Sequence, residues 1–306
     1  MKPTIVFLEA VDPAALKLLP AGEFLLVPPG STPVDYHQVR AIVTRGKGQV
    51  DRALIDRCPA LEVIVRCGVG VNNIDVPHAT ERKIAVLNVP GVNAATVAEH
   101  TLGLMLLLVR GMYRLLREVK EGNWAYRDHY TGQELRGLTL GIIGRGAIGS
   151  KVGGAAGELG MQVRYAQRSP LKQQPDELPL AELLSSSDVL SLHVPLTEET
   201  RQLIDAAALS QLRPGSFLIN TARGEVVDAP ALLDALESGH LAGYASDLLS
   251  GEGAVQQRLI GHPDVLITPH AASLTALTFR EMSERSVRHL VDHFAGHAIP
   301  GRYRVN

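Results

Sequence analysis

The sequence predicts an α/β protein made of two doubly wound domains, each built on a parallel sheet. Short runs rich in Val, Ile and Leu recur at wide intervals, and segments with helical patterning lie between them. The 306 residues also exceed the length that one hydrophobic core usually serves, which favours two domains. Because each crossover between parallel strands needs a helix, this alternation indicates sheets that are covered by helices on both faces.

The apolar runs fall into two series. The first series predicts strands at residues 4–8, 41–44, 62–67 and 85–89, with helices at residues 50–57 and 77–82. The second series predicts six strands, at residues 138–144, 162–166, 189–194, 216–220, 243–248 and 265–268. Each series has the alternation that is typical of one doubly wound domain.

One long helix is predicted between the two series, at residues 94–122. Residues 104–109 of this helix are apolar on more than one face. We therefore expect it to be buried by a second domain or a second subunit as well as by its own domain. An ordinary core helix is the alternative.

Composition and charge argue against several classes of protein. With 45% hydrophobic and 20% charged residues, the chain can fold around a core, which argues against disorder. A formal net charge of -2 gives no overall attraction for nucleic acid or anionic lipid. Cys58 and Cys67 have no metal-ligand spacing, so no metal site is expected. Neither a leader nor a membrane-spanning run is recognised, which predicts a cytoplasmic protein without a membrane partner.

A glycine-rich motif follows the first strand of the second series. It reads Gly144-Arg145-Gly146-Ala147-Ile148-Gly149, and a helix-compatible stretch comes after it. In a strand-to-helix turn of this kind, the first glycine makes the tight turn, the second lets the backbone approach a pyrophosphate, and the third allows close packing. The helix N-terminus then offers free N–H groups to the phosphates. The motif predicts a dinucleotide site, with a structural glycine turn as the alternative.

The end of the next strand predicts the type of dinucleotide. A protein that binds NAD normally has an acid here, whereas this sequence has Gln167, Arg168 and Ser169. Because a guanidinium and a hydroxyl can bind a 2'-phosphate, we expect NADP(H) to be preferred, with NAD(H) possible. Alternatively, Arg168 is a solvated loop cation and both cofactors are accepted.

Three residues with acid–base or anion-binding chemistry follow predicted strands of the second series. They are Arg223, Glu252 and His270. Because the carboxyl ends of parallel strands share the edge at which such sheets bind ligands, these side chains are expected on one rim. A guanidinium suits a carboxylate, and an acid beside an imidazole fixes its tautomer and raises its pKa. Taken singly, each residue also has an ordinary explanation, as a surface ion pair, a solvated acid or a capping side chain.

Several longer motifs occur in one order along the chain. They are RCGVGVNNID at residues 66–75, NVPGVNAATVAEHT at 88–101, the glycine motif, HVPLTEET at 193–200, NTARGEVVD at 220–228 and TPHAA at 268–272. Through them, nearly the whole chain resembles the D-isomer-specific 2-hydroxyacid dehydrogenase family. The sequence departs from the family pattern at Gly253, where Pro usually follows the acid, and at Asn72, where Asp is frequent.

The resemblance implies roles for individual residues. Arg223 would bind the carboxylate and carbonyl of the substrate, His270 would exchange the proton, and Glu252 would pair with His270. Further substrate contacts are implied for Arg45, which lies in a substrate loop, and for the backbone N–H groups of Val69 and Gly70.

Cofactor contacts beyond the glycine motif are implied in the same way. Asp247 would contact the nicotinamide carboxamide. The other residues implied in cofactor binding are His193, Pro195, Thr221 and Ala222.

The resemblance also implies a domain arrangement and an activity. A Rossmann cofactor domain at residues 98–272 would be inserted into a flavodoxin-like substrate domain made of residues 1–97 and 273–306, with no regulatory domain after Asn306. We expect a homodimeric oxidoreductase that uses NAD(P)H to reduce a small 2-keto acid, such as glyoxylate or hydroxypyruvate, to the D-2-hydroxy acid. The alternatives are an NAD-dependent phosphoglycerate or D-lactate dehydrogenase and a non-catalytic, NAD(P)-sensing protein like a corepressor. Which 2-hydroxy acid is used stays open.

Overall fold

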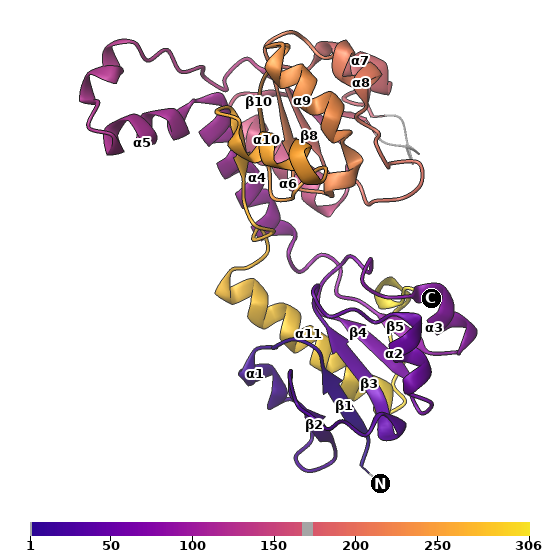
Figure 1. The fold of residues 1–306 in the computed structure, drawn as a ribbon. Coiled ribbons are helices and arrows are strands. Elements are labelled where there is room, and N and C mark those ends of the chain that lie inside the picture. Colours follow the sequence, from indigo (N-terminus) through magenta and orange to yellow (C-terminus); the bar gives the residue numbers. More distant parts are fainter. Residues whose placement is uncertain (1, 167–173) are drawn as a thin grey trace. The chain divides into compact units, whose positions relative to one another are not determined.

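The computed structural model describes residues 2–166 and 174–306, which form two compact units (Figure 1). Unit 1 comprises the residues up to Asn93 together with Ser273–Asn306, and unit 2 comprises Ala94–Ala272. Every strand pair in both units is parallel, which confirms the predicted fold class. Gln167, Arg168 and Ser169 lie outside the described residues.

Unit 1 is built on a five-stranded sheet of order β2-β1-β3-β4-β5. Its strands are β1 (Thr4–Phe7), β2 (Leu25–Val27), β3 (Val39–Thr44), β4 (Val63–Arg66) and β5 (Ala85–Leu87). Its helices are α1 (Pro13–Leu16), α2 (Arg52–Arg57), α3 (Val76–Glu81) and α11 (Ala276–Phe294), with 3-10 turns η1 (Tyr36–Gln38) and η4 (Gly301–Tyr303). The strand order reverses between β1 and β3, which is the position where such sheets bind ligands.

Helices cover both faces of the unit 1 sheet because both faces of its strands are apolar. On one face, Ala15 of α1 and Leu290 of α11 pack on Ile5 and Val43. On the other face, the core includes side chains of α2 and α3. The C-terminal helix α11 thereby completes a core that the first 93 residues begin.

Unit 2 is built on a six-stranded sheet of order β11-β10-β9-β8-β6-β7. Its strands are β6 (Thr139–Ile143), β7 (Gln162–Ala166), β8 (Val189–Leu192), β9 (Ser216–Asn220), β10 (Leu241–Ser246) and β11 (Val265–Ile267). Its helices are α4 (Ala94–Val109), α5 (Met112–Lys120), α6 (Ala147–Glu158), α7 (Leu180–Ser186), α8 (Ala206–Gln211), α9 (Ala229–Glu237) and α10 (Gly253–Gly261), with 3-10 turns η2 (Trp124–Asp128) and η3 (Gly224–Val226). The order reverses between β6 and β8, beside the glycine motif.

Two cores lie on the two faces of this sheet. Helices α4 and α6 bury their apolar residues on one face, whereas α7, α8, α9 and α10 bury theirs on the other. A parallel bridge between Tyr165 and Glu177 adds a short sixth pairing outside β7. This bridge occupies the place of the third strand in a Rossmann order.

The predicted helix at residues 94–122 is wrong as a single element. Gly111 adopts a left-handed conformation, with a φ of 60°, and separates α4 from α5. Because glycine has no Cβ, it adopts this conformation without strain, and the helix ends there. The apolar faces of α4 are buried in unit 2 itself, where Met105 and Leu108 pack with Ile142, so the alternative of an ordinary core helix describes it.

The short strand β2 was not predicted. Its three residues read Leu-Leu-Val at the edge of the sheet, and Leu25 is exposed. A run this short carries too little periodicity to indicate a strand. None of the helices in the described ranges is long and apolar enough to cross a membrane.

Candidate active site

The predicted site residues of each unit follow the carboxyl ends of its strands. In unit 2, the glycine motif follows β6, and His193 follows β8. Arg223, Asp247 and His270 come after β9, β10 and β11, which are neighbouring strands in the sheet. The fold therefore places the sequence-predicted residues of unit 2 along one edge of one sheet.

The geometry of the glycine motif fits a phosphate-binding turn. Gly144 has a φ of 100°, and a Cβ there would lie 2.4 Å from the carbonyl oxygen of His193. A Cβ on Gly149 would lie 2.1 Å from the carbonyl oxygen of Gly144, so both positions require glycine. A Cβ on Gly146 would meet no atom within 4 Å, which leaves open space over the turn. Gly146 starts α6 without a side-chain cap, so the first N–H groups of the helix are offered to a ligand.

Arg145, the second residue of the motif, is held inside unit 2. Its guanidinium donates to Asp176 at 2.7 Å and lies over the Tyr165 ring at 4.3 Å. The hydrogen bond to Asp176 raises the pKa of Arg145. The same guanidinium lies 3.6 Å from Glu177, so one cation is shared by two acids beside the end of β7.

His193 is a neutral imidazole at the end of β8. Its Nε2 lies 3.0 Å from the hydroxyl of Ser191, and its Nδ1 is buried with no hydrogen-bond partner among the described residues. Burial lowers the pKa of His193 to about 4. If His193 contacts the cofactor, as the resemblance implies, it does so as an uncharged imidazole. Pro195, two residues on, accepts a hydrogen bond from Thr200 through its carbonyl oxygen.

Arg223 is a partly buried cation just beyond β9. The side chain of Asn220 accepts from the N–H of Ala222 at 3.0 Å and donates to the carbonyl oxygen of Arg223 at 2.8 Å. The hydroxyls of Thr221 and Thr101 lie 2.9 Å apart, which ties the same turn to α4. Burial lowers the pKa of Arg223, although nearby Glu225 opposes the shift. A desolvated guanidinium of this kind gains from binding an anion.

Glu252 is exposed at the start of α10. The loop before it is anchored: Ser250 is buried with its hydroxyl 3.2 Å from that of Tyr244, and a Cβ on Gly224 would lie 2.1 Å from the carbonyl oxygen of Leu249. The loop therefore lies directly against the residue that follows Arg223. The pairing of Glu252 with His270 stays a prediction.

Asp247 holds the turn that carries His270. Only 2% of Asp247 is exposed. Its Oδ1 accepts from the hydroxyl of Thr268 at 2.5 Å and from the N–H of Ala271 at 2.8 Å, and its Oδ2 accepts from the N–H of Ala272 at 2.8 Å. His270 has a φ of 56°, a conformation that a residue with a side chain adopts only where its surroundings hold it. Both carboxylate oxygens are thus engaged within unit 2, while the implied nicotinamide contact stays a prediction.

His100 was not predicted as a site residue, although it lies in one of the quoted motifs. Its Nε2 lies 2.9 Å from the hydroxyl of Thr268 and 3.6 Å from Oδ1 of Asp247. Because the Thr268 hydroxyl donates to Asp247, it is free to accept from Nε2. His100 of α4 thereby supports the His270 turn. Its place on a helix face gave no sequence signal for this contact.

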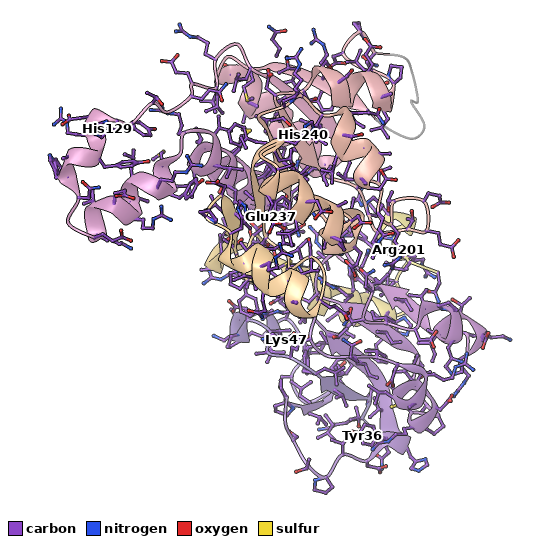
Figure 2. The ribbon with its side chains drawn as sticks, turned by 45° about the horizontal axis from the view of Figure 1, so that its top comes forward. Tyr36, Lys47, His129, Arg201, Glu237 and His240 are labelled. Atoms are coloured by element: carbon purple, nitrogen blue, oxygen red, sulfur yellow. The ribbon has the colours of Figure 1, made fainter. Side chains whose placement is uncertain are left out.

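In unit 1, the three implied substrate residues follow two neighbouring strands. Arg45 comes directly after β3, and Val69 and Gly70 come shortly after β4. The carbonyl oxygen of Val69 accepts from the side-chain amide of Asn88 at 2.9 Å, and the Val69 side chain is exposed. Lys47, labelled in Figure 2, belongs to the same loop as Arg45.

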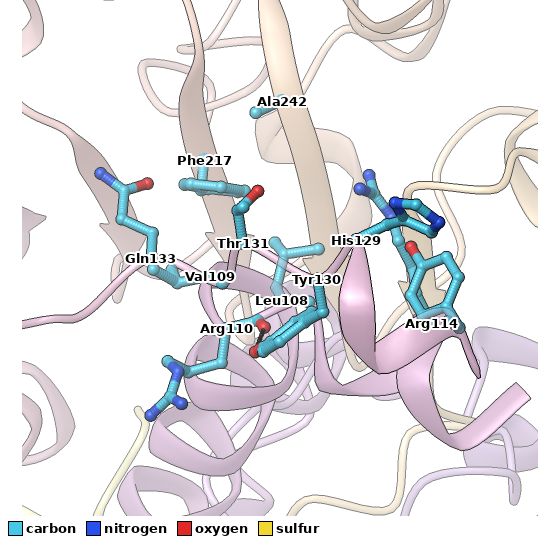
Figure 3. A pocket seen from close by; sticks show the side chains of 13 residues that line it. Leu108, Val109, Arg110, Arg114, His129, Tyr130, Thr131, Gln133, Phe217 and Ala242 are labelled. Atoms are coloured by element: carbon cyan, nitrogen blue, oxygen red, sulfur yellow. Dashed lines mark hydrogen bonds between the residues drawn. The ribbon is translucent and has the colours of Figure 1, made fainter. Parts of the chain in front are cut away.

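A separate cavity of about 370 Å³ lies at the other end of the unit 2 sheet (Figure 3). Phe217 and Ala242, which line it, belong to the starts of β9 and β10. The Tyr130 hydroxyl donates to the carbonyl oxygen of Arg110 in its wall. Its position at the amino ends of the strands separates it from the predicted site. In the described parts of the chain, no group of three or more His, Cys, Asp or Glu residues could hold a metal ion.

The fold and the glycine turn are typical of a dinucleotide-binding α/β protein, and comparisons with known proteins give its class. The family model for the NAD-binding domain of D-isomer-specific 2-hydroxyacid dehydrogenases matches residues 102–272. The chain belongs to this family, which confirms the resemblance and makes it an NAD(P)-dependent dehydrogenase of 2-hydroxy acids by class.

Individual relatives act on different acids. The (S)-sulfolactate dehydrogenase of Chromohalobacter salexigens is 41% identical over 78% of this chain and 79% of its own length. The D-3-phosphoglycerate dehydrogenase of Bacillus subtilis is 36% identical over 79% of this chain, and the match spans about half of that relative, 47%. The solved structure of an NADPH-dependent glyoxylate/hydroxypyruvate reductase from Sinorhizobium meliloti, in complex with NADP and malonate, has a TM-score of 0.87 and 31% identity, covering 100% of this chain and 97% of that one.

Proposed function

We propose that the protein reduces a small 2-keto acid of the glyoxylate or hydroxypyruvate type to the D-2-hydroxy acid, with NADPH as the preferred reductant. One observation carries the proposal: Arg223 and His270 follow β9 and β11, the strands on either side of β10, in the sheet whose β6 turn has the shape of a phosphate-binding turn. The similarity to the Sinorhizobium reductase supports the substrate class and the cofactor.

The residues of unit 2 fit a dinucleotide. The open space over Gly146 and the uncapped start of α6 suit a pyrophosphate, and neutral His193 adds no charge. When bound, the nicotinamide supplies the hydride that reduces the substrate carbonyl. Arg145 pairs with Asp176 beside β7 and also lies 3.6 Å from Glu177, so its charge offsets part of the negative charge that these two acids would set against a 2'-phosphate.

Arg223 orients the substrate and stabilises the charge that develops on it. Its planar guanidinium can bind a carboxylate and the adjacent carbonyl oxygen together. As hydride adds to the carbonyl carbon, negative charge grows on that oxygen, and a partly desolvated cation stabilises it more strongly than water would.

His270 gives a proton to the same oxygen. Imidazole suits this step because its ordinary pKa lies near neutrality. The turn held by Asp247 fixes the backbone of His270, so the ring approaches the substrate from one direction. Glu252 is proposed to keep this ring charged.

A direct test measures the oxidation of NADPH at 340 nm with a panel of glyoxylate, hydroxypyruvate, pyruvate and a phosphorylated 2-keto acid. We expect the highest kcat/KM with glyoxylate or hydroxypyruvate, and a higher kcat/KM with NADPH than with NADH. Preference for the phosphorylated acid with NADH would indicate a phosphoglycerate dehydrogenase instead. Absence of turnover with tight NADPH binding would favour a cofactor-sensing role.

We also propose that the protein works as a homodimer. Helix α5 projects from unit 2 (Figure 1), and it has no buried residue. Met112, Leu116 and Val119 recur at helical spacing on it, and Trp124 of η2 is 69% exposed. An exposed apolar stripe of this kind suits burial by a second copy. Light scattering should show a dimer that Leu116→Arg dissociates and Leu25→Arg, an exposed control on β2, leaves intact.

The free and buried Cys58 and Cys67 thiols support a reducing cytoplasmic location. Cell fractionation tests this placement.

A further inference from the structure

Glu9 of unit 1 collects hydrogen bonds from a loop that is distant in the sequence. Its Oε2 accepts from the N–H groups of Arg45 and Gly46, both at 2.7 Å, and of Gly48 at 3.0 Å. Glu9 follows β1, and the loop follows β3, which is the neighbouring strand. A carboxylate that accepts several N–H groups at once fixes the backbone conformation of the donors.

The other side of the loop is closed by two polar side chains. The carbonyl oxygen of Gly48 accepts from the hydroxyl of Thr44 and from the amide of Asn73, each at 2.6 Å. A Cβ on Gly48 would lie 2.6 Å from the Cβ of Leu8, so the loop is drawn close to the end of β1. The backbone of residues 44–48 is therefore held from both sides.

The Arg45 side chain is oriented by contacts with uncharged groups. Its Nη1 donates to the carbonyl oxygen of Ala10 at 3.3 Å, and its guanidinium lies over the Phe279 ring of α11 at 5.0 Å. In the part of the chain that the structure describes, no carboxylate forms an ion pair with this guanidinium. The positive charge of Arg45 is thus oriented but not neutralised within unit 1.

Glu9 is held in its charged form. Partial burial by itself raises the pKa of its carboxyl group, but hydrogen bonds from the N–H groups of Gly46, Gly48 and Arg45 outweigh burial and lower the pKa to about 2. The acceptor therefore stays ionised at neutral pH, and a neutral isostere would offer a weaker acceptor.

We propose that Glu9 is a positioning residue for substrate binding: it holds the 44–48 loop so that the guanidinium of Arg45 meets an anionic or polar group of the 2-keto acid. This rests on the proposed function, since it assigns Arg45 to the substrate. The glycines of the loop make such a clamp necessary, because Gly46 and Gly48 would otherwise leave its backbone free to adopt many conformations.

Glu9→Gln, Arg45→Met and the double variant test this coupling. We expect Glu9→Gln to raise KM for the 2-keto acid about 10-fold, with kcat changed less than about 3-fold and KM for NADPH unchanged. If Glu9 acts through Arg45, the double variant is no worse than Arg45→Met alone. Additive losses, or an unchanged KM in Glu9→Gln, would overturn the proposal.

Two further variants supply a second perturbation of the loop and a matched control. Asn73→Ala loosens the loop from its other side and should raise KM for the 2-keto acid in the same way. Glu23→Gln is the matched control, an exposed acid of unit 1 whose carboxylate makes none of the hydrogen bonds or ion pairs found among the described residues, and it should leave both KM values unchanged.

Hydrogen exchange gives a readout that does not depend on activity. Peptides covering residues 44–50 should exchange faster in Glu9→Gln than in the wild type, and equal exchange would show that Glu9 does not hold the loop. A wild type without turnover of any 2-keto acid removes the proposed function together with this proposal. Turnover with an unchanged KM in Glu9→Gln overturns the positioning role alone.

Discussion

In each unit, one buried or half-buried carboxylate fixes the backbone of a segment that follows a strand of the sheet. In unit 1, Glu9 accepts N–H groups from the loop after β3, and in unit 2, Asp247 accepts N–H groups from the turn after β11. Each carboxylate follows a strand and holds a segment that follows another strand of the same sheet. The carboxyl edge of a parallel sheet thereby gains fixed backbone where a ligand binds.

The difference between the two lies in what the held segment presents. The unit 1 loop contains two glycines and presents a flexible guanidinium, whereas the unit 2 turn holds His270 in a left-handed conformation. Asp247 is 2% exposed and contacts the side chains of Thr268 and His100. Glu9 is half-buried and accepts mainly from backbone N–H groups, with the Thr44 hydroxyl 3.3 Å away. The group that we propose to move a proton, His270, thus has the more deeply buried support, and the group that we propose to bind an anion, Arg45, has a less buried one.

The largest effect is expected from replacing the two proposed catalytic side chains of unit 2, Arg223 and His270. We expect Arg223→Gln and His270→Gln each to lower kcat/KM for the 2-keto acid about 1000-fold, because each removes charge stabilisation or proton transfer in the transition state. Steady-state kinetics measures this loss. NADPH affinity, followed by cofactor fluorescence, should stay within about 3-fold, and near-normal turnover in either variant would refute the assignment.

Loosening the His270 turn should have the next largest effect. Asp247→Asn replaces one acceptor oxygen with an amide donor that faces N–H groups, and we expect kcat to fall about 100-fold as His270 loses its alignment. Asp234→Asn, on the exposed face of α9, is the control and should leave kcat unchanged. If Asp247→Asn instead raised only the KM for NADPH, the nicotinamide contact would be its main role.

Substitutions at two glycines of the same turn, Gly146 and Gly149, should affect different properties, namely cofactor binding and stability. Gly146→Val fills open space over the turn, so we expect a folded protein whose KM for NADPH rises at least about 10-fold. Gly149→Ala places a Cβ against the carbonyl oxygen of Gly144 and should lower the free energy of unfolding by about 2 kcal/mol. Thermal unfolding and NADPH titration of both variants measure the difference, and identical behaviour of the two would contradict the phosphate-binding geometry.

The smallest expected effect is on stability in acid, where Glu9 becomes protonated and its hydrogen bonds to the 44–48 loop weaken. The pKa of Glu9 lies at about 2 in the folded protein, against 4.5 as its ordinary value. Its stabilisation is therefore fully present above pH 4.5 and is lost as the pH falls through about 2. After allowance for solvent screening, we expect on the order of 1 to 2 kcal/mol, and Glu9→Gln should make the free energy of unfolding less dependent on pH in this range. Parallel curves for the variant and wild type between pH 5 and 2 would show that Glu9 contributes nothing.

Much of the fold could be predicted because its strands are buried on both faces and read as continuous apolar runs. The strands β7 and β9 have their predicted bounds, and the others differ by a few residues at their ends. The break between α4 and α5 was missed because a single glycine does not show whether it will adopt a left-handed conformation. Strand β2 was missed because three residues at a sheet edge are held by pairing with β1 rather than by their own pattern.

The sequence by itself determined the α/β class, the glycine turn after β6 and the order in which Arg223, Asp247 and His270 follow their strands. Those features are local, since apolar periodicity and glycine spacing are written in neighbouring residues. Only the tertiary structure decided that Glu9 holds a loop 36 to 39 residues away and that Asp247 holds a turn 24 to 25 residues away. A carboxylate finds its donors through the pairing of strands, and that pairing exists only after the chain has folded.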